Sequence, residues 1–284
     1  MGREFEKTVV PITRSIIGFD SAWTDNPKAP GAVCIIRIGS NGHAQIAEPE
    51  LASFCRALEV IRFEHARSPH VLVAVDQPTI VRNLTGSRPV ERVVSSYISW
   101  IGGGVQPSNR GRTGMFDDAA PIWAFKAALG AVEDPEQARL AREGLFIMEV
   151  FPALALPGFF NQFSTRLGGP RYNPARRKTF KIENWQQVAL LLSELGVQSE
   201  IEGLAEWCSA HAKKGKPTKA DQDLLDALIC ATIGYHWLRA PRGQSIMIGD
   251  RETGYIVAPV RAGVHEKLSL AAMTHGVAID GAYI

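Results

Sequence analysis

The sequence predicts an α/β protein: a mixed five-stranded sheet flanked by helices, with helical and loop insertions and a C-terminal hairpin. Three observations support this fold class. First, three strand-like segments precede the first helical pattern, a spacing that suits an antiparallel meander. Second, apolar strands then alternate with helices, and strands joined by helices run parallel through right-handed crossovers. Third, the last two strand-like segments are close enough in the chain to pair as a hairpin.

The expected strands are short apolar or alternating runs. In the sheet they are 15–19, 32–38, 43–47, 71–75 and 144–150, and in the hairpin 245–249 and 254–259. The run VLVAV at 71–75 contains no polar residue, which is typical of a strand covered on both faces.

Apolar residues at helical spacing predict the helices. These segments are 49–67, 89–101, 117–130, 182–196, 200–214 and 221–240, followed by a helical tail after the hairpin. Several begin or end at residues typical of helix boundaries. The segment 117–130, for example, has an acidic residue at its start and a glycine at its end.

Composition is that of an ordinary globular protein, with 45% hydrophobic and 21% charged residues among 284. We expect a single domain over 1–284, with its core at about 15–259. No apolar run approaches the ~18 residues of a membrane span, and the N-terminus lacks the apolar region of a signal peptide. The four cysteines form no C-x-x-C pair, so we expect buried free thiols, a cytoplasmic location and no membrane partner.

Carboxylates recur where expected strands end. Asp20 follows the first strand, Asp76 the fourth, and Glu149 lies at the end of the fifth. Asp223 and Asp226 are three residues apart and therefore share one helix face. Each acid alone has an ordinary explanation as a turn residue, a helix cap or a partner of the helix dipole. If the strands are parallel neighbours, however, the acids converge at one sheet edge, where open α/β sheets place their sites.

Converging carboxylates repel one another unless they are protonated or neutralised. Mg²⁺ or Mn²⁺ takes oxygen ligands, and a pair of such ions suits a phosphodiester displacement. We therefore expect two ions, held by Asp20, Asp76 and Asp226. The predicted catalytic residues are these three together with Glu149 and Asp223.

A basic stretch indicates a polyanionic partner, although the net charge is only +2. No acidic residue occurs from Val150 to Ile182. The predicted substrate-binding residues are Arg88, Arg171, Arg176, Arg177 and Lys178. For Arg88 we favour a structural salt bridge with Glu91 over substrate contact. Trp23 and Tyr172 are candidates for base stacking; we favour packing for Trp23 and leave Tyr172 open.

Several short motifs occur in a fixed order: GFDSAW, VAVDQP, NLTGSRPVER, MEVFP, YNPARRKTF, LLSELG, DLLDALICA and IGDRETGYIVAP. Over residues 15–259 this series resembles the predicted RNase H-like nucleases, a family of unknown function within the RNase H-like superfamily. The resemblance implies an RNase H-like fold and two Mg²⁺ or Mn²⁺ ions. Among the metal-binding acids that the resemblance implies, Asp20, Asp76 and Asp226 match best, and Asp223 and Glu149 match less directly.

The predicted function is hydrolysis of phosphodiester bonds in nucleic acid, DNA or RNA, by a two-metal mechanism. One alternative is a nucleic-acid-binding module without turnover. Another, less favoured, is a phosphotransferase of the actin and sugar-kinase type, whose glycine-rich phosphate and adenosine loops we do not find. The chain contains neither G-x-x-x-x-G-K-[ST] nor a G-x-G-x-x-G after a strand, so no nucleotide-cofactor site is expected.

Overall fold

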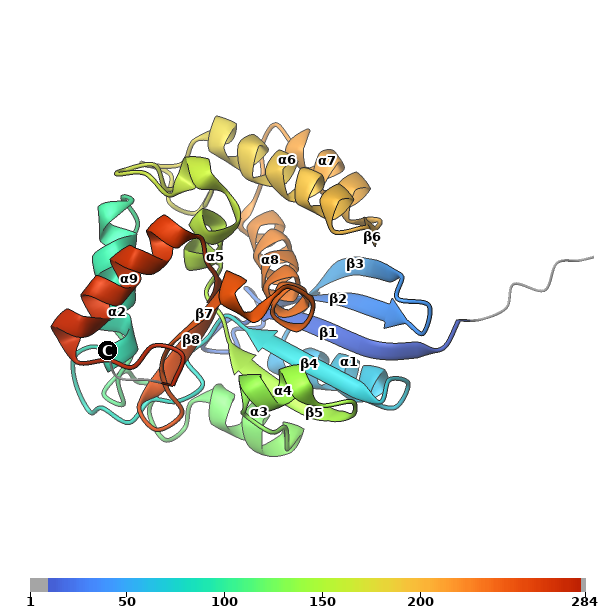
Figure 1. Cartoon of the computed structure of the whole chain (residues 1–284), viewed down its shortest axis with the longest axis horizontal. Coiled ribbons are helices and arrows are strands. Elements are labelled where there is room, and N and C mark those ends of the chain that lie inside the picture. The colour runs from blue at the N-terminus through green and yellow to red at the C-terminus, as the bar shows by residue number, and fades with distance from the viewer. Residues whose placement is uncertain (1–9, 282–284) are drawn as a thin grey trace, which may run out of the picture.

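The computed structural model of the chain describes residues 10–281. Its main element is a six-stranded mixed sheet in the order β5-β4-β1-β2-β3-β6 (Figure 1). The strands are β1 (Ile12–Asp20), β2 (Gly31–Gly39), β3 (Ala44–Ala52), β4 (His70–Val75), β5 (Gly144–Glu149) and β6 (Ile201–Glu202). The first three form an antiparallel meander, whereas β4 pairs parallel with both β1 and β5. The α/β class and the mixed sheet are confirmed.

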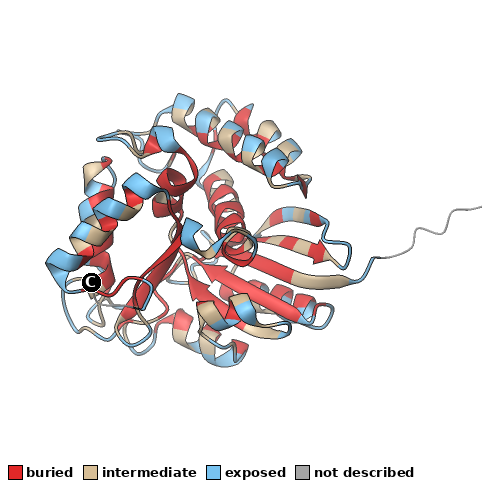
Figure 2. Ribbon diagram, viewed as in Figure 1, coloured by how far each residue is buried: buried red, intermediate tan, exposed pale blue. Residues whose placement is uncertain are grey.

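Helices cover both faces of the sheet (Figure 1). One face packs against α8 (Lys219–Arg239), with α6 (Ile182–Gln198) and α7 (Leu204–Ala212) completing that layer. The other packs against α1 (Phe54–His65) and α3 (Pro121–Leu129), while α4 (Pro135–Leu140) precedes β5. The central strands and α8 are coloured almost wholly as buried (Figure 2).

A second cluster of elements lies beside the sheet. Strands β7 (Ser245–Asp250) and β8 (Gly254–Pro259) form the predicted antiparallel hairpin. They pack with α2 (Pro89–Trp100), α5 (Pro152–Phe159) and α9 (Ala262–His275) around a separate apolar core. The short 3₁₀ turns are η1 (Asn161–Phe163) and η2 (Arg242–Gln244).

Gly18 allows α8 to lie directly against β1. A Cβ at this position would collide with the carbonyl oxygen of Ala227 and the amide of Ala231, and would lie 2.9 Å from the Ala231 Cα. Gly234 makes a similar approach from the helix, where a Cβ would meet the Ile16 side chain. These glycines bring the helix backbone close to the strand that ends at Asp20.

Some boundaries differ from the prediction. Strand β3 continues to Ala52, so the expected helix at 49–67 begins only at Phe54, where the Ser53 side chain caps it by accepting the Arg56 amide. The sheet has a sixth strand because two residues, β6, add to its edge. Helices α4 and α5 were not predicted.

All four cysteines lie among the described residues and are free thiols, as expected, but Cys55 is exposed while Cys34, Cys208 and Cys230 are buried. Within residues 10–281, none of the helices combines the length and the apolar character needed to cross a bilayer.

Candidate functional site

A cavity of about 710 Å³ lies at the carboxyl ends of β1 and β4. Its walls come from three directions: the strand ends, the first turns of α8, and the loops at 102–106 and 170–179. All five acids that the sequence analysis selected border it: Asp20, Asp76, Glu149, Asp223 and Asp226. However, the strand-end acids do not all project from the same face of the sheet, because their strands pair in different registers.

Asp20 and Asp76 occupy the same level of the sheet. In the parallel pairing Phe19 lies opposite Val75, and the Asp76 amide donates to the Phe19 carbonyl at 2.9 Å. The residues two before each acid, Gly18 and Ala74, face α8. Because side chains alternate along a strand, both carboxylates project toward the first turns of α8.

Glu149 is out of step with these two acids by one residue. It pairs with Val75, the residue before Asp76, so strand alternation places its side chain on the face that α1 and α3 cover. Its carboxylate accepts the Thr79 amide at 3.0 Å and two bonds from Arg88. The expectation that three strand-end acids occupy equivalent positions therefore holds for Asp20 and Asp76 but not for Glu149.

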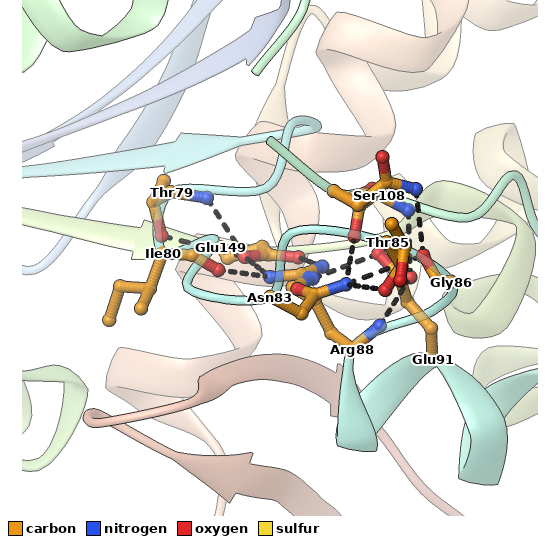
Figure 3. Close-up of polar contacts among 10 residues, drawn as sticks. Thr79, Ile80, Asn83, Thr85, Gly86, Arg88, Glu91, Ser108 and Glu149 are labelled. Carbon is orange, nitrogen blue, oxygen red and sulfur yellow. Dashed lines mark hydrogen bonds and ion pairs between the residues drawn. The ribbon is translucent and has the colours of Figure 1, made fainter. Parts of the chain in front are cut away.

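Arg88 is the centre of a buried polar network beside the cavity (Figure 3). Its guanidinium donates to Glu149 at 2.6 and 2.9 Å and to Glu91 at 2.8 Å. The second Glu91 oxygen accepts the amides of Arg88 and Ser108 at 3.0 and 2.9 Å. With only 1% of its surface exposed, Arg88 is not available to a substrate. The predicted structural salt bridge with Glu91 is present, and these ion pairs favour it over substrate contact by Arg88.

Helix α8 presents a polar stripe to the acids of the strands. Asp223 and Asp226 lie on it with Lys219 and Gln222, at the three- and four-residue spacing that aligns side chains on one face. Lys219 forms an ion pair with Asp223. Gln222 donates its amide to one Asp226 oxygen, and the Tyr172 hydroxyl donates to the other at 2.7 Å. The deeper part of the helix is apolar and packs in the core.

Four of the acids are buried, Asp76 is half-buried, and the group interacts electrostatically. Burial raises the pKa of Asp20, and the charges of Asp226 and Asp76 raise it further. Burial also raises the pKa of Asp76, again with a contribution from Asp226. For Asp226, burial raises the pKa from an ordinary 3.8 to about 6, although the hydrogen bond from Tyr172 and the charge of Lys219 oppose the rise. These shifts mean that ionising the acids together is unfavourable unless positive charge is added.

Within the described part of the chain, no three His, Cys, Asp or Glu side chains are disposed as a ready metal site. Both Asp226 oxygens accept hydrogen bonds in this structure, and Asp223 is paired with Lys219. Two buried amide atoms that border the cavity nevertheless lack hydrogen-bond partners, Oε1 of Gln222 and Nε2 of Gln77. Orphaned buried polar atoms of this kind are uncommon and indicate a missing ligand or water.

The cations of the basic stretch divide into two groups. Arg171 and Arg176 are exposed and border the cavity, whereas Arg177 and Lys178 are exposed but outside its lining. Only the first two are positioned to contact a group inside the cavity.

Two residues of the site were not predicted in their observed roles. Tyr172 is 8% exposed and fixes Asp226, and Lys219 supplies the positive charge nearest the acids. The segment 213–219 contains four lysines, but the position of Lys219 depends on where α8 begins. The Tyr172–Asp226 contact joins residues 54 apart in the chain and has no local signal.

A protein-family model described as "Protein of unknown function (DUF429)" matches residues 18–253. This span includes every acid of the cavity and its basic loop. Searches of curated proteins and of solved structures found no match to the chain.

Proposed function

The chain belongs to the DUF429 family, and we propose that it is a metal-dependent nuclease that hydrolyses phosphodiester bonds on an RNase H-like fold. One observation carries the proposal: carboxylates from two strand ends and one helix meet in a single cavity, where burial and mutual repulsion raise the pKa values of three of them. Strongly perturbed acids in a cleft are typical of functional sites.

The order of the strands supports the RNase H-like assignment. An antiparallel meander is followed by two parallel strands on the other side of β1, and α8 packs on one face of the sheet (Figure 1). The resemblance of the sequence motifs implies the same order. The position of Asp20, Asp76 and Asp226 within that order agrees with the expected set of ligands.

The residues fit a pair of Mg²⁺ or Mn²⁺ ions in their chemistry. Both ions prefer oxygen ligands, and Asp20, Asp76 and Asp226 would hold them with Asp223 and the unpartnered Gln222 oxygen nearby. Lys219 would have to release Asp223 if that acid takes part. When bound, such ions neutralise the charge that develops on the attacking and leaving oxygens of a phosphodiester.

The protein's own groups would position the substrate and the acids. Arg171 and Arg176 would bind phosphate groups at the mouth of the cavity. Tyr172 holds the Asp226 carboxylate in one orientation, and the end of β1 holds Asp20. The Arg88 network fixes the segment that follows Asp76 by joining Thr79, Ile80 and Glu149. Glu149 thus has a supporting role in place of a catalytic one.

A cleavage panel tests the proposal. Wild-type protein would be incubated with structured and unstructured DNA and RNA, with Mg²⁺, Mn²⁺ or EDTA. We expect divalent-cation-dependent cleavage that Asp20→Asn abolishes while thermal unfolding shows a folded protein. Asp118→Asn, at an exposed acid outside the cavity, should cleave normally. Normal cleavage by Asp20→Asn would refute the assignment, and salt-sensitive binding without any hydrolysis would favour the binding module.

A further inference from the structure

We infer that the substrate is a single strand, an unpaired segment or end of nucleic acid, and that intact duplex is excluded. This inference rests on the proposed nuclease function and names its substrate class. It follows from the burial of three of the acids, the hydrogen bonds that hold the loops of the cavity and the side chains that border it.

The acids lie at the floor of a small cavity. Asp20 and Asp223 are each 7% exposed, Asp226 is 5% exposed and Asp76 is half-buried, so a scissile phosphate must enter the cavity to reach all of them. Its volume, about 710 Å³, is in the range of small-molecule sites, roughly 300–1,000 Å³. Duplex DNA is stiff over about 150 base pairs, and base pairing prevents one strand from leaving the duplex to follow such a path.

The two loops that border the cavity at 102–106 and 170–179 are joined by backbone hydrogen bonds just before each begins. The amides of Leu167 and Gly169 donate to the carbonyls of Trp100 and Ile101 at 3.0 and 2.8 Å. The base of the basic loop is closed where the Lys181 amide donates to the Arg171 carbonyl at 2.8 Å. These bonds hold the loop whose Tyr172 hydroxyl donates to Asp226.

The loop is also joined to α6. The Arg171 amide donates to the Asn184 side chain at 2.9 Å. Arg171 itself is exposed at the cavity, so its backbone is fixed while its guanidinium remains available to a phosphate.

An aromatic side chain offers a surface for an unpaired base. Trp23 packs against Phe116, as favoured from the sequence, with ring centroids 5.3 Å apart. It is half-buried and borders the cavity, and its indole N–H donates to the Asp76 carbonyl at 3.2 Å. Its backbone is in the left-handed region, with φ of 48°. Such strain costs about 1–3 kcal/mol and is concentrated at functional sites. In proteins that bind single-stranded nucleic acid, bases stack on aromatic rings and basic residues line the path of the phosphate backbone.

Matched substrates test the inference. A fluorescein-labelled 20-nucleotide single strand and the same strand in a blunt duplex would be compared for Mn²⁺-dependent cleavage by the full-length protein. Binding would be measured by fluorescence anisotropy with phosphorothioate versions, which resist hydrolysis. We expect the single strand to be cleaved at least fiftyfold faster and bound at least tenfold more tightly than the duplex.

Two pairs of variants examine the entrance. Trp23→Ala should weaken single-strand binding about tenfold, whereas Trp207→Ala, at a tryptophan outside the cavity, should not. Arg176→Gln should lower the salt dependence of binding, whereas Arg142→Gln, exposed before β5, should leave it unchanged. Unchanged single-strand binding by a Trp23→Ala protein with a normal unfolding temperature would contradict the stacking role.

The outcomes separate this inference from the proposed function. Equal cleavage of single strand and duplex would overturn the inference and leave the nuclease standing. Selective binding of the single strand without hydrolysis would support the inference and refute the nuclease. Absence of both binding and cleavage would refute both.

Discussion

Asp226 should make the protein less stable as the pH rises, provided that divalent cations are absent. Its carboxylate is 5% exposed, and burial raises its pKa from 3.8 to about 6. A group whose pKa is higher in the folded state favours folding fully below its unfolded pKa and loses that contribution as the pH rises through its folded pKa. For Asp226 this loss falls between about pH 4 and pH 6.

The substitution Asp226→Asn replaces the carboxylate by a neutral group of similar shape. The amide oxygen can still accept the Tyr172 hydrogen bond. A shift of about 2 pKa units at 1.36 kcal/mol per unit corresponds to about 3 kcal/mol. We therefore expect Asp226→Asn to raise the free energy of unfolding at pH 8 in EDTA by about 3 kcal/mol, or the melting temperature by roughly 6–10 °C.

Urea or thermal unfolding of both proteins at several pH values between 4 and 8 measures this effect. The advantage of the variant should be small at pH 4 and complete by pH 7. Mn²⁺ should stabilise the wild type at pH 8 and stabilise the variant much less, because a cation that binds only the folded state shifts the equilibrium.

A second acid on the same helix provides a control, because its pKa is shifted in the opposite direction. Asp221 caps the start of α8 and accepts from Lys214. Its pKa is lowered: the Lys214 and Thr218 contacts outweigh the opposing effect of burial. Asp221→Asn should therefore destabilise the protein at pH 8. If Asp226→Asn is no more stable than the wild type at pH 8, or if its advantage is the same at pH 4, the reasoning is refuted.

Three further substitutions follow from the same geometry. Gly18→Ala should lower the free energy of unfolding by more than the ~1–3 kcal/mol of ordinary overpacking, because the added Cβ meets helix backbone; Gly215→Ala, in open space, should not change the urea midpoint. Arg88→Met should destabilise by about 3–5 kcal/mol, since it leaves Glu149 and Glu91 buried without their counter-ion; partly restored stability in Arg88→Met/Glu149→Leu would support this cause. Lys219→Met should tighten Mn²⁺ binding in calorimetry, because Lys219 is the cation now closest to the acids; unchanged affinity would show that the two cations do not compete.

The sheet was predictable because its strands carry strong local signals. The run at 71–75 and the acids after two strands are features of the sequence alone, and the parallel pairing follows from the helices between them. Boundaries were less predictable where two patterns overlap. Residues 49–52 fit a helical spacing of apolar side chains, yet pairing with β2 extends β3 through them, and Ser53 starts the helix.

The sequence predicted which edge of the sheet holds the site. It did not predict toward which face of the sheet each acid projects. A single residue of register decides whether a strand-end side chain joins Asp20 or turns away, and no pattern in the sequence indicates that Glu149 pairs with Val75. Local spacing did identify the Asp223 and Asp226 stripe. Contacts between distant segments, such as Tyr172 with Asp226, become apparent only in the folded chain.

The charge of the cavity connects its cation to its substrate. Six acidic and four basic side chains border it, so at full ionisation the lining carries a formal charge of −2. A phosphate chain that enters brings further negative charge into a setting where charges are weakly screened. Cations must therefore accompany the chain, and single-strand binding itself should require Mg²⁺ or Mn²⁺. Anisotropy with the phosphorothioate strand measures this directly: binding that EDTA leaves undiminished would mean that the basic residues of the loop suffice, and the acids would need another explanation.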